Sequence, residues 1–172
     1  MNLTLATDDT GGPEIFASLQ GEGPSAGMPV AFVRLSRCNL ACTWCDTAYT
    51  WRFANEQGGD NRPHRDGIAF DRKANQVTLS AEDTAQRIAA LGQKRLVITG
   101  GEPLLQQKLL VELLETVDRT SQEPPFVEIE TNGTVSPVEG LLRRVDQWNV
   151  SPKLSIAGEP ESKRIRERAL SV

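Results

Sequence analysis

The three cysteines of this chain all fall within residues 38–45, and this cluster constrains the protein more than any other feature. An odd number of thiols, in a sequence that starts without a secretory signal, does not fit a disulfide framework, which needs an even number and an oxidising compartment. Cys38, Cys42 and Cys45 suit zinc or an iron–sulfur cluster instead. Three thiolates leave one metal position open. If the metal is zinc, the single histidine, His64, is the candidate fourth ligand.

Composition and charge narrow the class of protein. With 172 residues, 38% of them hydrophobic and 24% charged, the chain is long enough for one globular domain with a core. The net charge of −4 argues against a nucleic-acid partner, whose phosphates need clustered Lys and Arg. No run approaches the ~18 apolar residues that cross a bilayer. We therefore expect a cytoplasmic protein that binds neither nucleic acid nor membrane.

Hydrophobic patterns predict an α/β fold with mainly parallel strands, because buried strands alternate with helices. A polar segment rich in Gly, Asn and Asp, at about residues 52–75, is expected to be an irregular insertion. Strands are predicted at 29–35, 95–99, 126–130 and 147–150, and helices at 80–91 and 105–117.

The unusual motifs of the sequence each follow one of these strands. They are the cysteine loop, Thr99–Pro103, Thr131–Thr134 and Ser151–Lys153. In parallel sheets, ligands bind at the carboxyl ends of the strands. The sequence therefore predicts one site to which all four segments contribute.

The cysteine spacing, followed by Gly100-Gly101-Glu102-Pro103 after the second strand, resembles the radical S-adenosylmethionine (SAM) superfamily. The resemblance implies a partial (β/α) barrel, with residues 1–172 as a single core domain. It also implies a [4Fe–4S] cluster whose open iron binds SAM and whose electron cleaves it, giving a 5′-deoxyadenosyl radical. Glycine in the second motif would let the backbone approach the cofactor closely.

Further segments resemble 7-carboxy-7-deazaguanine synthase over roughly residues 13 to 155: Glu14–Gly23, Cys45-Asp46-Thr47, Glu130–Thr134 and Val150–Lys153. That family converts 6-carboxy-5,6,7,8-tetrahydropterin into 7-carboxy-7-deazaguanine with loss of ammonia, on the way to queuosine. The resemblance also implies Mg²⁺, an electron donor of the flavodoxin or ferredoxin type and a homodimer.

The same resemblance implies a role for individual residues. The cluster is expected on the three cysteines and Mg²⁺ on Thr47. Arg34 would pair with the substrate carboxylate, because a guanidinium binds a carboxylate through two hydrogen bonds. The expected substrate residues are Leu19, Gln20, Gly21, Glu22, Arg34 and Thr99, and the expected SAM residues are Trp44, Cys45, Asp46, Gly101, Ser151, Pro152 and Lys153.

The end of the chain departs from the family pattern. Relatives continue with further strands and helices, whereas residues 158–172 form a charged tail that predicts a solvated helix, so the barrel is expected to be shortened at the C-terminus. Three alternatives stay open. They are another radical enzyme such as a glycyl-radical activating enzyme, which lacks the segment Leu19–Gly23; a zinc-binding module without catalysis; and a truncated relative that binds the cluster without activity.

Overall fold

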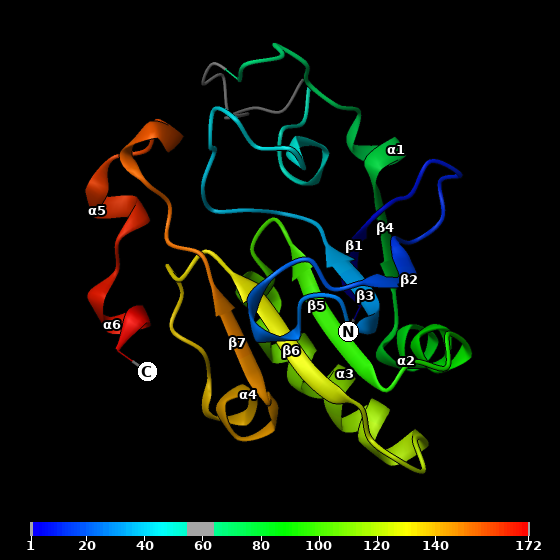
Figure 1. Ribbon diagram of the computed structural model, residues 1–172. Coiled ribbons are helices and arrows are strands. Elements are labelled where there is room, and N and C mark those ends of the chain that lie inside the picture. The colour runs from blue at the N-terminus through cyan, green and yellow to red at the C-terminus, as the bar shows by residue number, and fades with distance from the viewer. Residues whose placement is uncertain (1, 55–63, 172) are drawn as a thin grey trace.

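A single mixed sheet organises the computed structural model, which describes residues 2–54 and 64–171 (Figure 1). In the described residues the strand order is β4-β1-β3-β5-β6-β7, and β2 also pairs with β3. The strands are β1 (Leu3–Ala6), β2 (Ile15–Leu19), β3 (Pro29–Leu35), β4 (Gln76–Leu79), β5 (Arg95–Gly100), β6 (Phe126–Thr131) and β7 (Gln147–Val150). The helices are α1 (Arg72–Asn75), α2 (Ala81–Ala90), α3 (Gln107–Thr120), α4 (Glu139–Arg144), α5 (Glu161–Arg164) and α6 (Glu167–Leu170), with 3₁₀ turns η1 (Gly23–Ser25), η2 (Ala48–Thr50), η3 (Pro103–Gln106) and η4 (Ser155–Ala157).

The parallel part of the sheet confirms the predicted fold class. Strands β3, β5, β6 and β7 pair in parallel, in chain order, and correspond to the four predicted strands. Their carboxyl ends therefore lie at one edge of the sheet. Strands β1, β2 and β4 were not predicted, and they pair antiparallel on the far side of β3.

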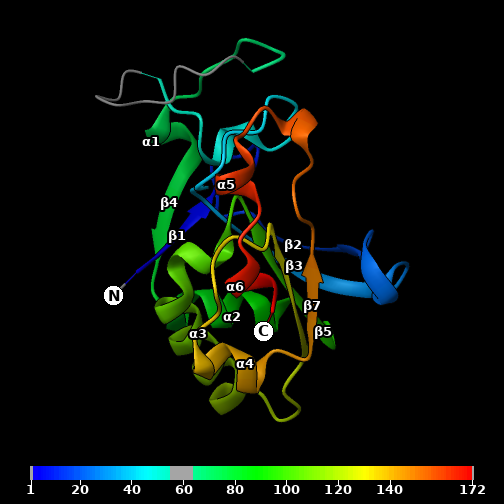
Figure 2. The same ribbon diagram turned by 90° about the vertical axis from the view of Figure 1, so that its left-hand side faces the viewer.

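The two faces of the sheet differ in polarity because side chains alternate along each strand. Val33, Ile98 and Ile129 belong to the main apolar core, on the side that α2, α3 and α4 occupy in Figure 2. On the opposite face, Arg34 and Glu128 place charged groups at the alternate positions of β3 and β6. One face thus supplies the core, and the other is available for a polar site.

Local sequence explains where the helices begin. Ser80 caps α2 by accepting a hydrogen bond from the Asp83 amide at 3.0 Å, and its hydroxyl donates to the Asp83 carboxylate at 2.8 Å, as the partial capping box predicts. The helix predicted from residue 105 begins instead as the 3₁₀ turn η3. Because a 3₁₀ turn has 3.0 residues per turn rather than 3.6, Leu105 rotates out of the apolar face and is exposed.

The segment expected to be irregular contains short stretches of regular structure. In its described part, a bridge joins Phe53 to Phe70, and α1 begins after Asp71, whose carboxylate accepts the Ala74 amide at 2.8 Å. Strand β4 follows directly. Residues 55–63 lie outside the described residues, so the expectation is not tested there.

The prediction of one helix over the charged tail is wrong, although Lys163, Arg166, Glu167 and Arg168 are exposed as predicted. The tail forms two short helices, α5 and α6, and Figure 1 shows that the chain first rises past the end of β7 before returning through them. Arg164 is largely buried and donates to the carbonyl of Lys153 at 3.1 Å. Among residues 2–54 and 64–171, no helix is long and apolar enough to cross a lipid bilayer.

Candidate functional site

A cavity of about 330 Å³ lies at the carboxyl ends of the parallel strands and brings most of the predicted site residues together. Two predicted residues are not among those that line it: Leu19, which is 61% exposed, and Pro152. The predicted residues that do line it are Gln20, Gly21, Glu22, Arg34, Cys38, Cys42, Trp44, Cys45, Asp46, Thr47, Thr99, Gly101, Ser151 and Lys153.

Gly100, Glu130, Thr131 and Asn132 also line the cavity, and they belong to segments that the sequence analysis singled out without giving these residues a role. Sequence reasoning missed Phe32, Leu40, Trp51 and Asn149. Strand alternation carried a usable signal for some of them. Phe32 precedes Arg34 by two positions and therefore lies on the same face of β3. The position of Trp51, in contrast, depends on the course of an irregular loop.

The cysteine loop leaves the sheet at Arg37, whose φ of 82° makes it the one described non-glycine residue with a positive φ. This strained conformation turns the chain away from β3 immediately before Cys38. Hydrogen bonds hold it on both sides: the Arg37 amide donates to the carbonyl of Thr50 at 2.7 Å, and its carbonyl accepts the amide of Glu102 at 2.9 Å. The first thiol is therefore positioned against the Gly-Gly-Glu-Pro turn.

The chain after β7 supports one side of the loop. The carboxylate of Glu159, whose side chain is fully buried, accepts the Ala41 amide at 2.7 Å. The Thr43 amide donates to the carbonyl of Ala157 at 3.0 Å, and Gly158 lies directly against the Thr43 side chain. The tail thus supplies hydrogen-bond partners for the backbone of a loop that has no regular secondary structure of its own.

His64 and Arg65 support the other side. The Arg65 amide donates to the carbonyl of Thr43 at 2.9 Å, and the His64 Nε2–H donates to the carbonyl of Cys45 at 2.8 Å. The His64 Nδ1 accepts the amide of Asp66 at 3.3 Å, so both ring nitrogens have backbone partners. His64 therefore holds the loop and does not serve as a fourth ligand. Within the described ranges, no group of three His, Cys, Asp or Glu side chains is arranged to hold a single metal ion.

The three thiols fit an iron–sulfur cluster by chemistry and by place. They are soft donors that line a single cavity with the backbone of Gly100 and Gly101. Burial raises the pKa of the Cys38 thiol to about 12, opposed by the hydrogen bond from the Leu40 amide. Binding of iron would replace the proton on such a thiol.

Glu102 is the buried acid that ties the Gly-Gly-Glu-Pro turn to the end of β6. Its carboxylate accepts the Thr131 hydroxyl at 2.9 Å, the Asn132 amide at 2.9 Å and the Leu104 amide at 3.0 Å. Desolvation raises the pKa of Glu102, and these hydrogen bonds oppose the shift. The group therefore serves as an acceptor that fixes two motif-bearing loops together.

Replacing Glu102 by glutamine should lower the free energy of unfolding by about 1–3 kcal/mol, because one acceptor oxygen becomes a donor facing buried N–H and O–H groups. Urea denaturation of the apoprotein measures this difference. Glu115→Gln on the exposed face of α3 is the matched control. Equal stability of the two variants would contradict the role assigned to Glu102.

A buried polar network fixes the segment after β2. The Gln20 side chain donates to Glu128 at 3.2 Å, while its carbonyl oxygen accepts the amides of Gly21 at 2.7 Å and Glu22 at 3.1 Å. Glu128 is fully buried and also pairs with Arg95 at 2.8 Å. The Gln20 amide group is thus occupied in positioning the loop that carries Glu22 to the cavity.

Charged side chains of both signs face the cavity. The Arg34 Nε donates to Glu14 at 2.7 Å, and Tyr49 donates to the other oxygen of Glu14 at 2.8 Å. Arg34 makes no hydrogen bond through its two terminal nitrogens to any described residue. Desolvation raises the pKa of Glu22, and the nearby Glu130 carboxylate adds to the shift.

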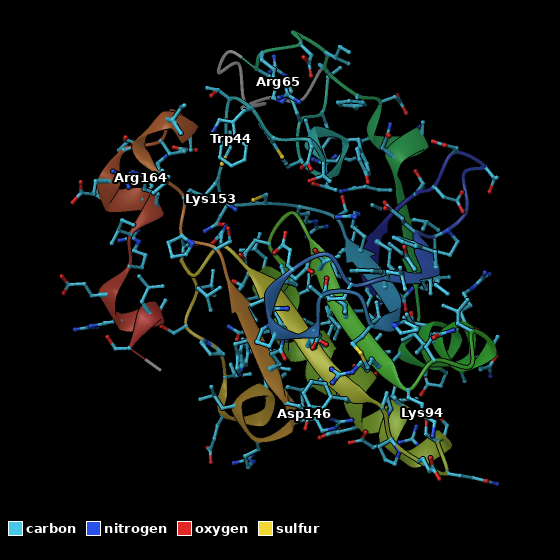
Figure 3. All side chains as sticks on the ribbon, in the orientation of Figure 1. Trp44, Arg65, Lys94, Asp146, Lys153 and Arg164 are labelled. Carbon is cyan, nitrogen blue, oxygen red and sulfur yellow. The ribbon has the colours of Figure 1, made fainter. Side chains whose placement is uncertain are left out.

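Two of the predicted SAM residues, Trp44 and Lys153, lie near one another (Figure 3). The Lys153 ammonium lies 5.8 Å from the centre of the Trp44 ring and 3.1 Å from the Ser151 hydroxyl. Thr47, the predicted Mg²⁺ ligand, has its hydroxyl 3.6 Å from the Cys45 sulfur.

Comparison with known proteins agrees with this geometry. The chain is 40% identical over 146 residues to 7-carboxy-7-deazaguanine synthase of Pyrobaculum aerophilum and 36% identical over 149 residues to that of Neisseria meningitidis. These matches cover 84% and 87% of this chain, which spans 55% of the length of each relative. The crystal structure of QueE from Escherichia coli aligns with a TM-score of 0.65 at 27% identity, covering 99% of this chain and 68% of that one.

The Radical SAM superfamily profile matches residues 33–165, from β3 through the cysteine loop to the tail. This is most of the chain, and it contains every segment that converges on the cavity except the one after β2. The chain belongs to the radical SAM superfamily.

Proposed function

We propose that this protein catalyses the 7-carboxy-7-deazaguanine synthase reaction, the conversion of 6-carboxy-5,6,7,8-tetrahydropterin into 7-carboxy-7-deazaguanine with loss of ammonia. The observation that carries the proposal is that one cavity contains both the three thiols and the segment Gln20–Glu22 with Arg34. The named relatives are synthases of this kind. The thiols alone favour a radical SAM enzyme, and the segment Gln20–Glu22 with Arg34 favours this substrate.

The cysteine side of the cavity would hold the cofactors. Cys38, Cys42 and Cys45 would ligate a [4Fe–4S] cluster, which, when bound, supplies the electron that cleaves SAM reductively. The backbone of Gly101 is exposed to the cavity without a side chain in the way, and Lys153 offers a cation beside the aromatic face of Trp44. These groups suit a ligand that carries a carboxylate, an amine and an adenine ring.

The opposite side would hold the pterin. Arg34 supplies two guanidinium nitrogens for the substrate carboxylate, oriented by the bond between its Nε and Glu14. Glu22 and Glu130 offer carboxylates to the guanidine-like edge of the pterin. Thr47 also lines the cavity and offers a hydroxyl oxygen, the kind of hard ligand that Mg²⁺ prefers.

We also propose that the protein acts in the cytoplasm as a homodimer and receives its electron from a flavodoxin or ferredoxin. The proposal rests on the family resemblance. Sedimentation velocity measures the oligomeric state, and reduction of the cluster by purified flavodoxin tests the donor.

Anaerobic reconstitution tests the reaction itself. The protein is supplied with iron and sulfide, reduced with dithionite, and given SAM with and without the carboxypterin and Mg²⁺. The expected products are 5′-deoxyadenosine and a pterin-dependent 7-carboxy-7-deazaguanine. Formation of deoxyadenosine without the deazaguanine would be consistent with a radical SAM enzyme but would contradict the proposed substrate. Binding of stoichiometric zinc in place of a cluster would contradict both the radical SAM activity and the proposed substrate.

Arg34→Lys should raise the apparent KM for the carboxypterin by about ten- to a hundredfold, because lysine keeps the charge but loses the paired hydrogen bonds to a carboxylate. Iron content should stay at the wild-type level. Arg119→Lys on the surface of α3 is the control. If Arg34→Lys lost cluster and substrate affinity in equal measure, Arg34 would be a structural residue.

A further inference from the structure

Trp51 donates a hydrogen bond to one of the three cysteine sulfurs. Its indole Nε1 lies 3.3 Å from the Cys45 Sγ. The indole N–H can only donate, so the direction of this bond is fixed. This distance is shorter than those of the Leu40 amide from the Cys38 sulfur, 3.5 Å, and of the Thr47 hydroxyl from the Cys45 sulfur, 3.6 Å.

The ring of Trp51 is held in place by its surroundings. The residue closes η2, with its amide donating to the carbonyl of Ala48 at 3.1 Å. Its ring meets the buried His64 ring edge to face, at 6.5 Å between centroids and 71° between planes. His64 itself donates to the Cys45 carbonyl. Trp51 and His64 thus fix the sulfur and the backbone of the same cysteine.

We propose that Trp51 raises the reduction potential of the cluster through this hydrogen bond. A donor to a cysteine sulfur stabilises negative charge, and the cluster with its three thiolates carries one more negative charge after it accepts an electron. The bond therefore favours the reduced state over the oxidised one. Trp51 acts as a tuning residue that contacts a ligand atom. The inference rests on the cluster of the proposed function and not on its substrate.

The test compares Trp51→Phe with wild type and with Trp148→Phe, a tryptophan on the helix-facing side of β7. Each protein is reconstituted anaerobically and titrated with dithionite, without SAM, while electron paramagnetic resonance follows the reduced cluster. Trp51→Phe should show a more negative midpoint potential at unchanged iron content, and Trp148→Phe the wild-type value. Water entering around the smaller ring would shift the potential the other way, because water also stabilises the reduced cluster.

A second variant removes the N–H without changing the size of the ring. Replacement of Trp51 by 3-benzothienylalanine, in which sulfur takes the place of the indole N–H, should reproduce the negative shift. Equal midpoint potentials in the wild type and both Trp51 variants would overturn the inference. Loss of the cluster from both Trp51 variants would also overturn it, because Trp51 would then be needed for cluster assembly. Failure of the wild type itself to take up a cluster would count against the proposed function instead.

Discussion

Replacing Cys42 by alanine is expected to abolish the iron–sulfur cluster and, with it, the cleavage of SAM. The thiol lies in a small apolar cluster with Leu40 and Ala157, and it lines the same cavity as the other two cysteines. Two thiolates cannot hold a cluster that must also leave one iron open. The loss should exceed the ~10- to 100-fold typical of a residue that only orients a ligand. Iron and sulfide analysis after anaerobic reconstitution measures it directly.

Thr43→Ala is the control in the same loop, because it removes the 3.4 Å bond from its hydroxyl to the carbonyl of Ile156 and a side-chain contact with Gly158, but keeps the backbone hydrogen bonds of the loop. It should bind close to the wild-type amount of iron. Both variants should unfold near the wild-type denaturant midpoint as apoproteins. A full complement of iron and sulfide in Cys42→Ala would contradict the assignment of this cysteine as a ligand.

The sequence was sufficient to predict the parallel strands whose carboxyl ends carry the candidate site. Strands such as Arg95–Gly100 are buried on both faces, so they are continuous apolar runs that end abruptly at a glycine motif. Because parallel strands share one carboxyl edge, the motifs after β3, β5, β6 and β7 had to meet. That inference needed no knowledge of any single side-chain contact.

The edge of the sheet and the tail were not predictable in this way. Strands β1 and β4 pair antiparallel, outside the alternation of strands and helices that predicted β7, and their order depends on partners far away in sequence. The burial of Glu159 gives no local signal at all. A charged residue in a charged segment is normally solvated, and the amide that this carboxylate accepts, that of Ala41, lies far away in the sequence.

The surroundings of the site residues were also beyond the sequence. The pattern could nominate Arg34 as a cavity residue, but not Glu14 and Tyr49 as the groups that orient it. Likewise, His64 was a candidate zinc ligand by composition, because it is the single histidine. Its ring nitrogens turned out to bind backbone groups, a matter of loop geometry that composition does not encode.

Gly101→Ala is expected to push the Gly-Gly-Glu-Pro turn away from the cysteine loop. A Cβ at Gly101 would lie 2.8 Å from the Cβ of Cys38 and closer still to the carbonyl oxygen of Arg37. Carbon atoms do not approach one another so closely, and the backbone at Arg37 is already held by two hydrogen bonds. The turn must therefore move outward, and a displacement of about 1 Å in a reacting site can cost about a hundredfold in rate.

The consequence should be a fall of about a hundredfold in SAM cleavage, with a smaller loss of bound iron, because the turn that moves carries none of the three thiols. Reductive cleavage is measured as deoxyadenosine formed under dithionite. Gly12→Ala is the matched control, since a Cβ there would meet the Asp8 carboxylate at 3.4 Å and the Thr10 hydroxyl at 3.5 Å, which are ordinary contacts. Wild-type cleavage by Gly101→Ala would show that the close approach of this backbone to Cys38 is not needed to bind the cofactor.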